Sequence, residues 1–197
     1  MVGKHSFPIV GLVLTGGKST RMKKDKALIN YRGAPHARHL FDLLSSVCDE
    51  VYLSARKEQW SGSQISDLPI IVDKYEVGGP INGILSAMDL KPNAHLMVVA
   101  CDLVNIDETA LNKLVDEFDD NFVAVAYKNL DKGFPEPLCT LYSPEAKEIF
   151  RNALLEQDIK CPVKVLKNNR VKLIDQGPGF DLTNVNTTEE YRSFQNG

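Results

Sequence analysis

The residues best suited to chemistry lie between Thr15 and Lys26, directly after a short apolar run. Gly16 and Gly17 let the backbone approach a ligand closely and turn its amides toward phosphate oxygens. Arg21 and Lys26 can place permanent charge on an anion, the guanidinium through paired hydrogen bonds and the ammonium as a point charge. Residues of these types in this order predict a loop that holds the phosphates of a nucleoside triphosphate.

The charge distribution points to the same loop. The chain has a net charge of −3, whereas the segment from Thr15 to Lys26 holds five bases and one acid, which makes that segment +4 and the remainder −7. Such a basic cluster repels itself unless a polyanion joins it, and the negative total argues against a general nucleic-acid binder. The loop matches neither the Walker A pattern nor the G-x-G-x-x-G fingerprint of dinucleotide-binding proteins. An exposed basic turn is the alternative interpretation.

Two aspartates, Asp73 and Asp102, each follow an apolar run that reads as a buried strand. In an open parallel sheet the ligand crevice lies beyond the carboxyl ends of the strands. Magnesium prefers oxygen ligands and keeps several waters, so one or two carboxylates suffice to hold it. The pattern predicts Asp102 as a magnesium ligand, and a plain turn or capping aspartate remains the alternative for both residues.

Three further positions are polar or glycine-rich enough to meet a ligand. The segment from Gly78 to Gly83, which includes Gly79, is either a loop that enters a helix at Pro80 or a close backbone approach to a nucleobase. Asn184 and Asn186 lie two residues apart and share one face if the chain there is extended. A turn before a final helix explains the two asparagines equally well.

Apolar runs alternate with amphipathic segments along most of the chain, which predicts a three-layer α/β fold with a mostly parallel sheet and helices on both faces. Pro35 suits a first helical turn, Ser143 an N-cap, and Thr187 with Glu190 a capping box. Strands are predicted at residues 9–14, 50–54, 68–72, 96–100, 122–127, 138–142 and 171–174, and helices at 34–47, 80–90, 108–118, 143–155 and from 162 to about 166.

Length and composition bound the remaining expectations. The 197 residues fit a single domain, with a first half at about 8–120 and an elaborated second half at about 121–197. The four cysteines form no C-x-x-C pair, so neither a zinc site nor a disulfide framework is indicated. No apolar run approaches the roughly 20 residues of a membrane span, and no signal peptide is evident. We expect a cytoplasmic protein that binds neither membrane nor nucleic acid.

Several segments together resemble the MobA-like nucleotidyltransferases. Residues 14–26 resemble that family's L-A-G-G-x-S-x-R-M-G-x-D-K loop, with Thr15 in place of the pattern's alanine and Lys23 in place of its second-half glycine. Residues 71–84 are similar to D…G-P-L-A-G-I, residues 99–102 to the strand-ending C-D, residues 136–142 to E-P-L-x-A-x-Y, and residues 181–191 to F-x-N-I-N-T-P-E-D-L. The resemblance covers nearly the whole chain.

The resemblance implies a Rossmann-like fold of the nucleotide-diphospho-sugar transferase type, with a nucleotide-binding first half and an acceptor-binding second half. The family's best-known members use GTP and Mg²⁺ to attach GMP to molybdopterin, and they release pyrophosphate. For this chain it implies nucleotide contacts from Leu14, Thr15, Gly16, Gly17, Lys26, Ser54, Asp73, Gly79 and Asp102, acceptor contacts from Asn184 and Asn186, and Mg²⁺ on Asp102.

The expected reaction is in-line attack of an acceptor phosphate on the α-phosphorus of GTP, with Arg21, Lys26 and Asp102 as the catalytic residues. Molybdopterin is the expected acceptor. We also expect transient contacts with proteins that make or accept the molybdenum cofactor. The alternatives are a cytidylyltransferase, a sugar-phosphate nucleotidylyltransferase, or a nucleotide-binding regulator without catalysis.

Overall fold

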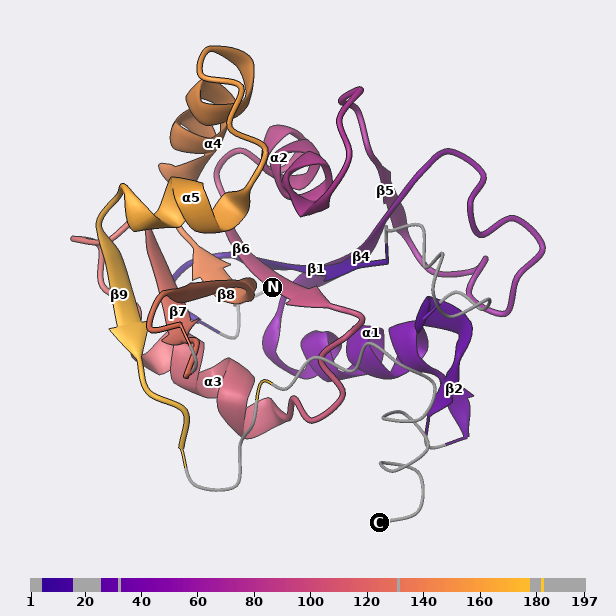
Figure 1. Ribbon diagram of the computed structural model, residues 1–197. Coiled ribbons are helices and arrows are strands. Elements are labelled where there is room, and N and C mark those ends of the chain that lie inside the picture. Colours follow the sequence, from indigo (N-terminus) through magenta and orange to yellow (C-terminus); the bar gives the residue numbers. More distant parts are fainter. Residues whose placement is uncertain (1–4, 16–25, 32, 131, 178–181, 183–197) are drawn as a thin grey trace.

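A seven-stranded sheet forms the middle layer of the protein in the computed structural model (Figure 1), which describes residues 5–15, 26–31, 33–130, 132–177 and 182. Its strands lie in the order β5-β4-β1-β6-β8-β7-β9. Their bounds are β1 Ile9–Leu14, β4 Glu50–Ala55, β5 Ile70–Val72, β6 His95–Ala100, β7 Ala124–Lys128, β8 Pro135–Tyr142 and β9 Val171–Ile174.

Most strand pairs in the sheet are parallel, as the sequence predicts. The pairs β5–β4, β4–β1, β1–β6 and β7–β9 are parallel, whereas β8 runs antiparallel to both β6 and β7. Both β1 and β6 are buried at every residue, which is why they read as continuous apolar runs. The chain leaves β1 toward β4 and β5 and returns to β6 on the other side of β1, so the strand order reverses between β1 and β6.

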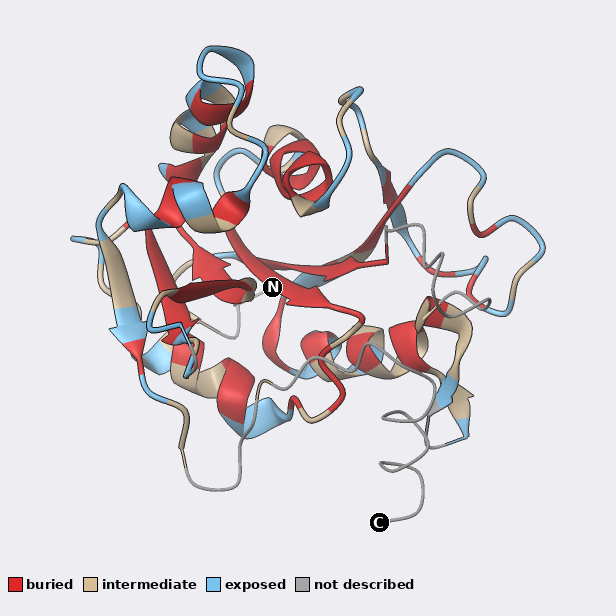
Figure 2. Ribbon diagram, viewed as in Figure 1, coloured by how far each residue is buried: buried red, intermediate tan, exposed pale blue. Residues whose placement is uncertain are grey.

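Helices cover both faces of the sheet and complete the three layers (Figure 1). Helices α1 (His36–Val47) and α3 (Glu108–Asp116) pack on one face. On the other face lie α2 (Pro80–Leu90), α4 (Ala146–Leu155) and α5 (Pro162–Lys167). Figure 2 shows burial concentrated on the strands and on the sheet-facing sides of the helices, so the two apolar cores lie between the layers. In the described ranges no helix combines the length and apolar character that crossing a bilayer requires.

Two helix starts differ from the sequence prediction. Pro35 does not open α1, because its ψ of 136° is extended and it belongs to a short strand, β3 (Ala34–Pro35), paired with β2 (Asn30–Tyr31). Ser143 does not cap α4, which begins at Ala146 without a side-chain cap. The Ser143 amide instead donates to the Val123 carbonyl and so continues the pairing of β8 with β7, while its hydroxyl oxygen is buried without a hydrogen-bond partner among the described residues. The capping box at Thr187 and Glu190 lies outside the described residues.

Candidate functional site

The carboxyl ends of β1 and β6 lie side by side at the point where the strand order reverses. Leu14 is paired with Ala100, and the Cys101 amide donates to the Leu14 carbonyl across 3.3 Å. Thr15 follows the end of β1, and Asp102 lies just beyond the end of β6. A reversal of this kind opens a crevice beyond the strand ends, which is where ligands bind in open α/β sheets.

Thr15 is fixed at the exit of β1 by four hydrogen bonds. Its amide and its hydroxyl both donate to the Ser54 carbonyl, at 3.3 Å and 2.6 Å. The hydroxyl oxygen accepts from Trp60 Nε1 at 2.9 Å, and the Thr15 carbonyl accepts from Gln59 Nε2 at 3.3 Å. The threonine that departs from the family pattern is therefore satisfied in a buried network at the end of β1.

Ser54 and Asp73 lie together at the ends of neighbouring strands. The Ser54 hydroxyl donates to Asp73 Oδ1 at 2.8 Å, and the Asp73 amide donates to the Ala55 carbonyl at 3.0 Å. Burial raises the pKa of the Asp73 carboxyl, and the hydrogen bond from Ser54 counteracts that rise. The structure thus brings together two of the residues predicted to meet the nucleoside, with the serine orienting the carboxylate.

Helix α2 approaches these strand ends unusually closely. A Cβ atom built on Gly83 would lie 2.1 Å from Ser54 Oγ and 2.9 Å from Leu14 Cδ2, so only glycine fits between the helix and the strands. Gly79 caps the same helix with a φ of 91°, a conformation that favours glycine. Within residues 78–83, the close contact is therefore made by Gly83, and it is a contact with Ser54 and Leu14 of the protein and not with a ligand.

Asp102 lies just beyond the carboxyl end of β6, and one of its carboxylate oxygens is buried. Its Oδ1 atom is buried and has no hydrogen-bond partner among the described residues. Burial raises the pKa of Asp102, while the charge of Lys26, in the 3-10 helix η1 (Lys26–Leu28), counteracts that rise. A buried carboxylate without a partner is costly, and a cation bound at that oxygen removes the cost.

The donor set is compatible with magnesium. No group of three or more His, Cys, Asp or Glu side chains suited to a metal occurs in the described part of the chain. Magnesium does not require such a cage, because it commonly binds one or two carboxylates together with waters and substrate phosphates. Asp102 supplies such a carboxylate, and the charge of Lys26 acts on it.

Glu136, at the start of β8, is a second buried acid near Asp102 for which the sequence predicted no role. Only 7% of Glu136 is exposed, and its carboxylate accepts from the Leu138 amide at 3.3 Å and from Asn129 Nδ2 at 3.5 Å. Burial raises the pKa of Glu136, and the charge of Asp102 adds to that rise. The sequence signal that could have identified Glu136 is an acidic residue between two prolines at the start of a mostly apolar strand.

The predicted site residues divide into two groups. The described ones line the strand ends and the adjoining segments: Leu14, Thr15, Lys26, Ser54, Asp73, Gly79 and Asp102. The others lie outside the described residues: Gly16, Gly17, Arg21, Asn184 and Asn186.

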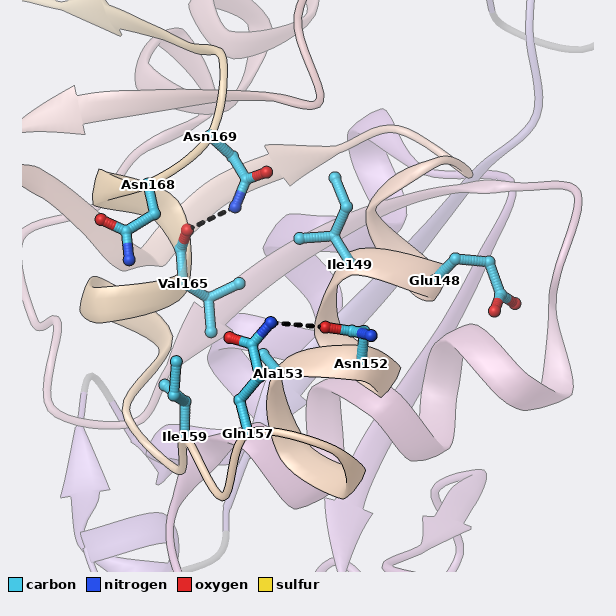
Figure 3. Close-up of a pocket in the computed structure, with 9 residues that line it drawn as sticks. All are labelled: Glu148, Ile149, Asn152, Ala153, Gln157, Ile159, Val165, Asn168 and Asn169. Atoms are coloured by element: carbon cyan, nitrogen blue, oxygen red, sulfur yellow. Dashed lines mark hydrogen bonds between the residues drawn. The ribbon is translucent and has the colours of Figure 1, made fainter.

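A separate cavity of about 420 Å³ lies between α4 and α5 (Figure 3). Its lining residues are Glu148, Ile149, Asn152, Ala153, Gln157, Ile159, Val165, Asn168 and Asn169. None of them is a predicted site residue, so this cavity is separate from the predicted site at the strand ends.

Comparison with known proteins identifies the family. Residues 11–171 match the model of the MobA-like NTP transferase domain. The chain belongs to this family. It is therefore a member of a nucleotidyltransferase family, and the resemblance read from its motifs is confirmed.

Relatives with similar sequences carry names from molybdenum cofactor synthesis. The chain is 46% identical to the molybdenum cofactor biosynthesis bifunctional protein of Synechocystis sp. over 93% of its own length, and it spans about half (53%) of that relative. It is 29% identical to a probable molybdenum cofactor guanylyltransferase of Bacillus cereus, with 92% of each chain covered.

Solved structures confirm the fold type. Molybdopterin-guanine dinucleotide biosynthesis protein A of Archaeoglobus fulgidus superposes with a TM-score of 0.77 at 21% identity, covering 95% of this chain and 97% of that one. The 4-diphosphocytidyl-2C-methyl-D-erythritol synthase of Anaerococcus prevotii superposes with a TM-score of 0.70 at 15% identity, covering 96% and 95%. The Rossmann-like nucleotidyltransferase architecture predicted from the sequence is thus confirmed.

Proposed function

We propose that this chain transfers GMP from GTP to molybdopterin, forming molybdopterin guanine dinucleotide and releasing pyrophosphate. Membership in the MobA-like family and the name of the Bacillus cereus relative support this substrate pair. The structural observation that carries the proposal is the buried Asp102 Oδ1, which has no hydrogen-bond partner in the described part of the chain. Asp102 lies at the reversal of strand order, and the charge of Lys26 acts on its carboxyl group. We propose that the reaction takes place in the cytoplasm. We also propose that the chain is one domain, in which residues from about 8 to 120 contact the nucleotide and residues from about 121 to 197 contact the acceptor.

In this proposal GTP lies beyond the ends of β1, β4 and β6. Leu14 and the hydrogen-bonded Thr15 fix the start of the phosphate loop, in which Gly16 and Gly17 direct amides at the phosphates. Ser54, Asp73 and Gly79 border the nucleoside, since the Ser54–Asp73 pair presents an oriented carboxylate at the edge of the crevice.

Asp102 is the residue that we assign to magnesium. When bound there, the ion would polarise the α-phosphate of the nucleotide. Lys26 and Arg21 contribute fixed positive charge and stabilise the charge that develops on the departing pyrophosphate. Glu136 is near enough to interact with Asp102, since the charge of Asp102 raises the pKa of Glu136.

The chemistry itself requires little from the side chains. An oxygen of the molybdopterin phosphate forms a bond to the α-phosphorus as the bond to pyrophosphate breaks. Because a phosphate monoester is already ionised near neutral pH, no general base has to remove a proton. The protein holds two anions together and neutralises their charge, and we assign Asn184 and Asn186 to the acceptor side. Direct transfer of the labile pterin from or to another protein of the pathway is part of the proposal.

The decisive test is incubation of the protein with GTP, Mg²⁺ and molybdopterin, followed by mass spectrometry. The proposal predicts molybdopterin guanine dinucleotide and an equal amount of pyrophosphate. Parallel reactions with CTP and ATP distinguish the bases, and a dinucleotide made only from CTP would replace guanylyl transfer by cytidylyl transfer. Triphosphate binding without any product would indicate a regulator instead of an enzyme.

A further inference from the structure

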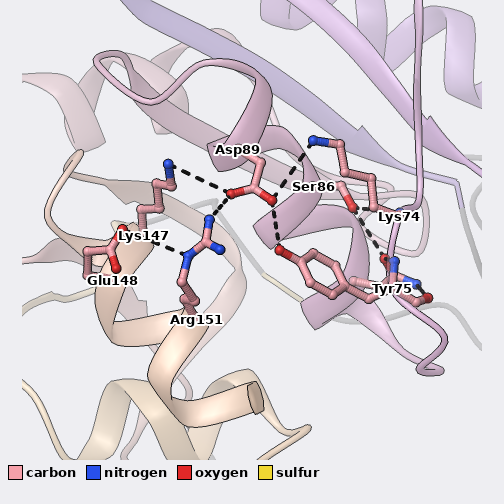
Figure 4. A network of polar contacts seen from close by, with 8 residues as sticks. Lys74, Tyr75, Ser86, Asp89, Lys147, Glu148 and Arg151 are labelled. Atoms are coloured by element: carbon pink, nitrogen blue, oxygen red, sulfur yellow. Dashed lines mark hydrogen bonds and ion pairs between the residues drawn. The ribbon is translucent and has the colours of Figure 1, made fainter. Parts of the chain in front are cut away.

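The short loop from Lys74 to Val77 leads from Asp73 at the end of β5 to the Gly79 cap of α2. It therefore connects two residues that we assign to the nucleoside. Such a loop could be held only by its two ends, but here it is bonded along its length to the side of α2 (Figure 4). The contacts come from three helix residues, each about one turn apart: Asn82, Ser86 and Asp89.

Asn82 makes the densest set of these contacts. Its Oδ1 accepts from the Tyr75 amide at 3.0 Å, and its Nδ2 donates to the carbonyls of Tyr75 and Val77, the latter at 3.0 Å. The residue is only 5% exposed. The amide thus satisfies three backbone groups of the loop at once, which neither a purely donating nor a purely accepting side chain can do.

Ser86 and Asp89 extend the attachment along the helix. Ser86 Oγ accepts from the Lys74 amide at 2.9 Å and donates to Asn82 Oδ1 at 3.3 Å. Asp89 Oδ2 accepts from the Tyr75 hydroxyl at 2.7 Å, and the Asp89 carboxylate also binds Arg151 of α4. Burial and the neighbouring carboxylate raise the pKa of Tyr75 to about 12, so the phenol remains a donor.

The helix residue next to Asn82 is fixed to the strand ends. Gly83 packs against Ser54 and Leu14 without room for a side chain. The loop is therefore held to a helix turn whose own position is set by the residues that start the phosphate loop and orient Asp73. Asn82 links the position of the loop to that of the strand ends.

We propose that Asn82 is a positioning residue, which holds the Lys74–Val77 loop in its nucleotide-binding conformation before GTP arrives. The inference rests on the proposed function. A loop that is already ordered loses little entropy when the ligand binds, so preorganisation increases affinity without adding a contact to the ligand. The amide acts on the binding of GTP and not on the bonds that form and break, so its loss changes KM and leaves kcat nearly unchanged.

The test compares two variants with a matched control. Asn82→Ala removes the amide, and Asn82→Asp keeps nearly the same volume but directs an oxygen at the two loop carbonyls. Asn169→Ala is the control, because Asn169 Nδ2 donates to the Val165 carbonyl at 2.7 Å in α5, next to the cavity between α4 and α5. The measurements are GTP affinity by calorimetry without acceptor, hydrogen exchange of residues 74–79 without nucleotide, and KM and kcat with molybdopterin.

Both Asn82 variants are expected to weaken GTP binding roughly tenfold, the loss expected from one or two hydrogen bonds of the loop. Exchange at residues 74–79 rises in both, KM for GTP rises in parallel, and kcat stays within about twofold. Asn169→Ala should lower the melting temperature without changing GTP affinity. If both Asn82 variants bind GTP as tightly as wild type does, the inference is wrong and the proposed function stands. If the wild-type protein binds no triphosphate, both the proposed function and the inference are wrong.

Discussion

Ser54 and Asp73 form a hydrogen-bonded pair, with 2.8 Å between the serine Oγ and the aspartate Oδ1, across the ends of β4 and β5. Ser54 also packs closely against Gly83 of α2 and is only 2% exposed. A side chain buried in this way serves to orient its neighbour, so the serine fixes the direction of the Asp73 carboxylate.

Ser54→Ala is expected to leave Asp73 without this donor. Loss of one buried hydrogen bond should lower the free energy of unfolding by about 1 kcal/mol, and GTP affinity should fall several-fold because the carboxylate is no longer held. Urea unfolding and GTP calorimetry measure the two effects. Unchanged affinity in a folded Ser54→Ala protein would show that Asp73 does not depend on the serine.

Gly83→Ala tests the close packing of α2. The new Cβ would lie 2.1 Å from Ser54 Oγ, so the helix must move, at a cost of about 1–3 kcal/mol in the free energy of unfolding. Gly78→Ala is the matched control, since no atom lies within 4 Å of a Cβ built there. Chemical denaturation of both variants should show a loss in the first and little change in the second. Equal stability of the two proteins would contradict this packing.

Asp102→Asn tests the charge at the end of β6. Magnesium-dependent release of pyrophosphate should disappear, because the amide lacks the charge that holds the ion. Without magnesium the same variant should melt at a higher temperature than wild type at pH 7. The pKa of Asp102 is raised by burial, so its ionised form destabilises the fold as the pH rises through that pKa, and the amide avoids this loss. Asp67→Asn, at an exposed ion pair with Arg38, is the control and should retain full activity.

The burial of His36 leads us to expect that the stability of the protein depends on pH. Burial, with a smaller contribution from His39, lowers the pKa of this fully buried histidine from 6.5 to about 4. The unfolded chain therefore binds a proton that the folded chain does not, and stability falls as the pH drops from 6.5 toward 4. The loss attributable to His36 is about 3 kcal/mol at its largest. Urea unfolding of wild type and His36→Gln between pH 7 and 4 measures it, and identical pH profiles would refute the prediction.

Much of the architecture could be predicted because sequence signals mark the element boundaries. The strand Ile9–Leu14 and the helix Pro80–Leu90 have the predicted bounds, since an apolar run before two glycines and a proline at the first helical turn define them locally. Pro35 and Ser143 were assigned wrongly, because both residue types favour a helix start whereas strand pairing holds each of them in an extended segment. Pro35 pairs with Asn30 of the neighbouring strand β2, and the Ser143 amide bonds to the Val123 carbonyl.

The site was also only partly predictable, because several of its contacts depend on how the chain folds and not on local sequence. Asp73 and Asp102 could be proposed as site residues because carboxylates that follow apolar strands are visible in the sequence. Asn82 replaces the alanine of the family pattern, yet its partners Tyr75 and Val77 become evident only when the loop folds back on α2. The partners of Thr15 lie some 40 residues away, and no spacing rule predicts them.

The most direct test of the central claim is a crystal structure with Mg²⁺ and a GTP analogue that cannot be cleaved. We predict the triphosphate between the loop that begins at Thr15 and the carboxylate of Asp102, with the metal on Asp102 and the nucleoside against Ser54, Asp73 and Gly79. An analogue bound in the cavity between α4 and α5, with the ends of β1 and β6 left free of nucleotide, would contradict the account.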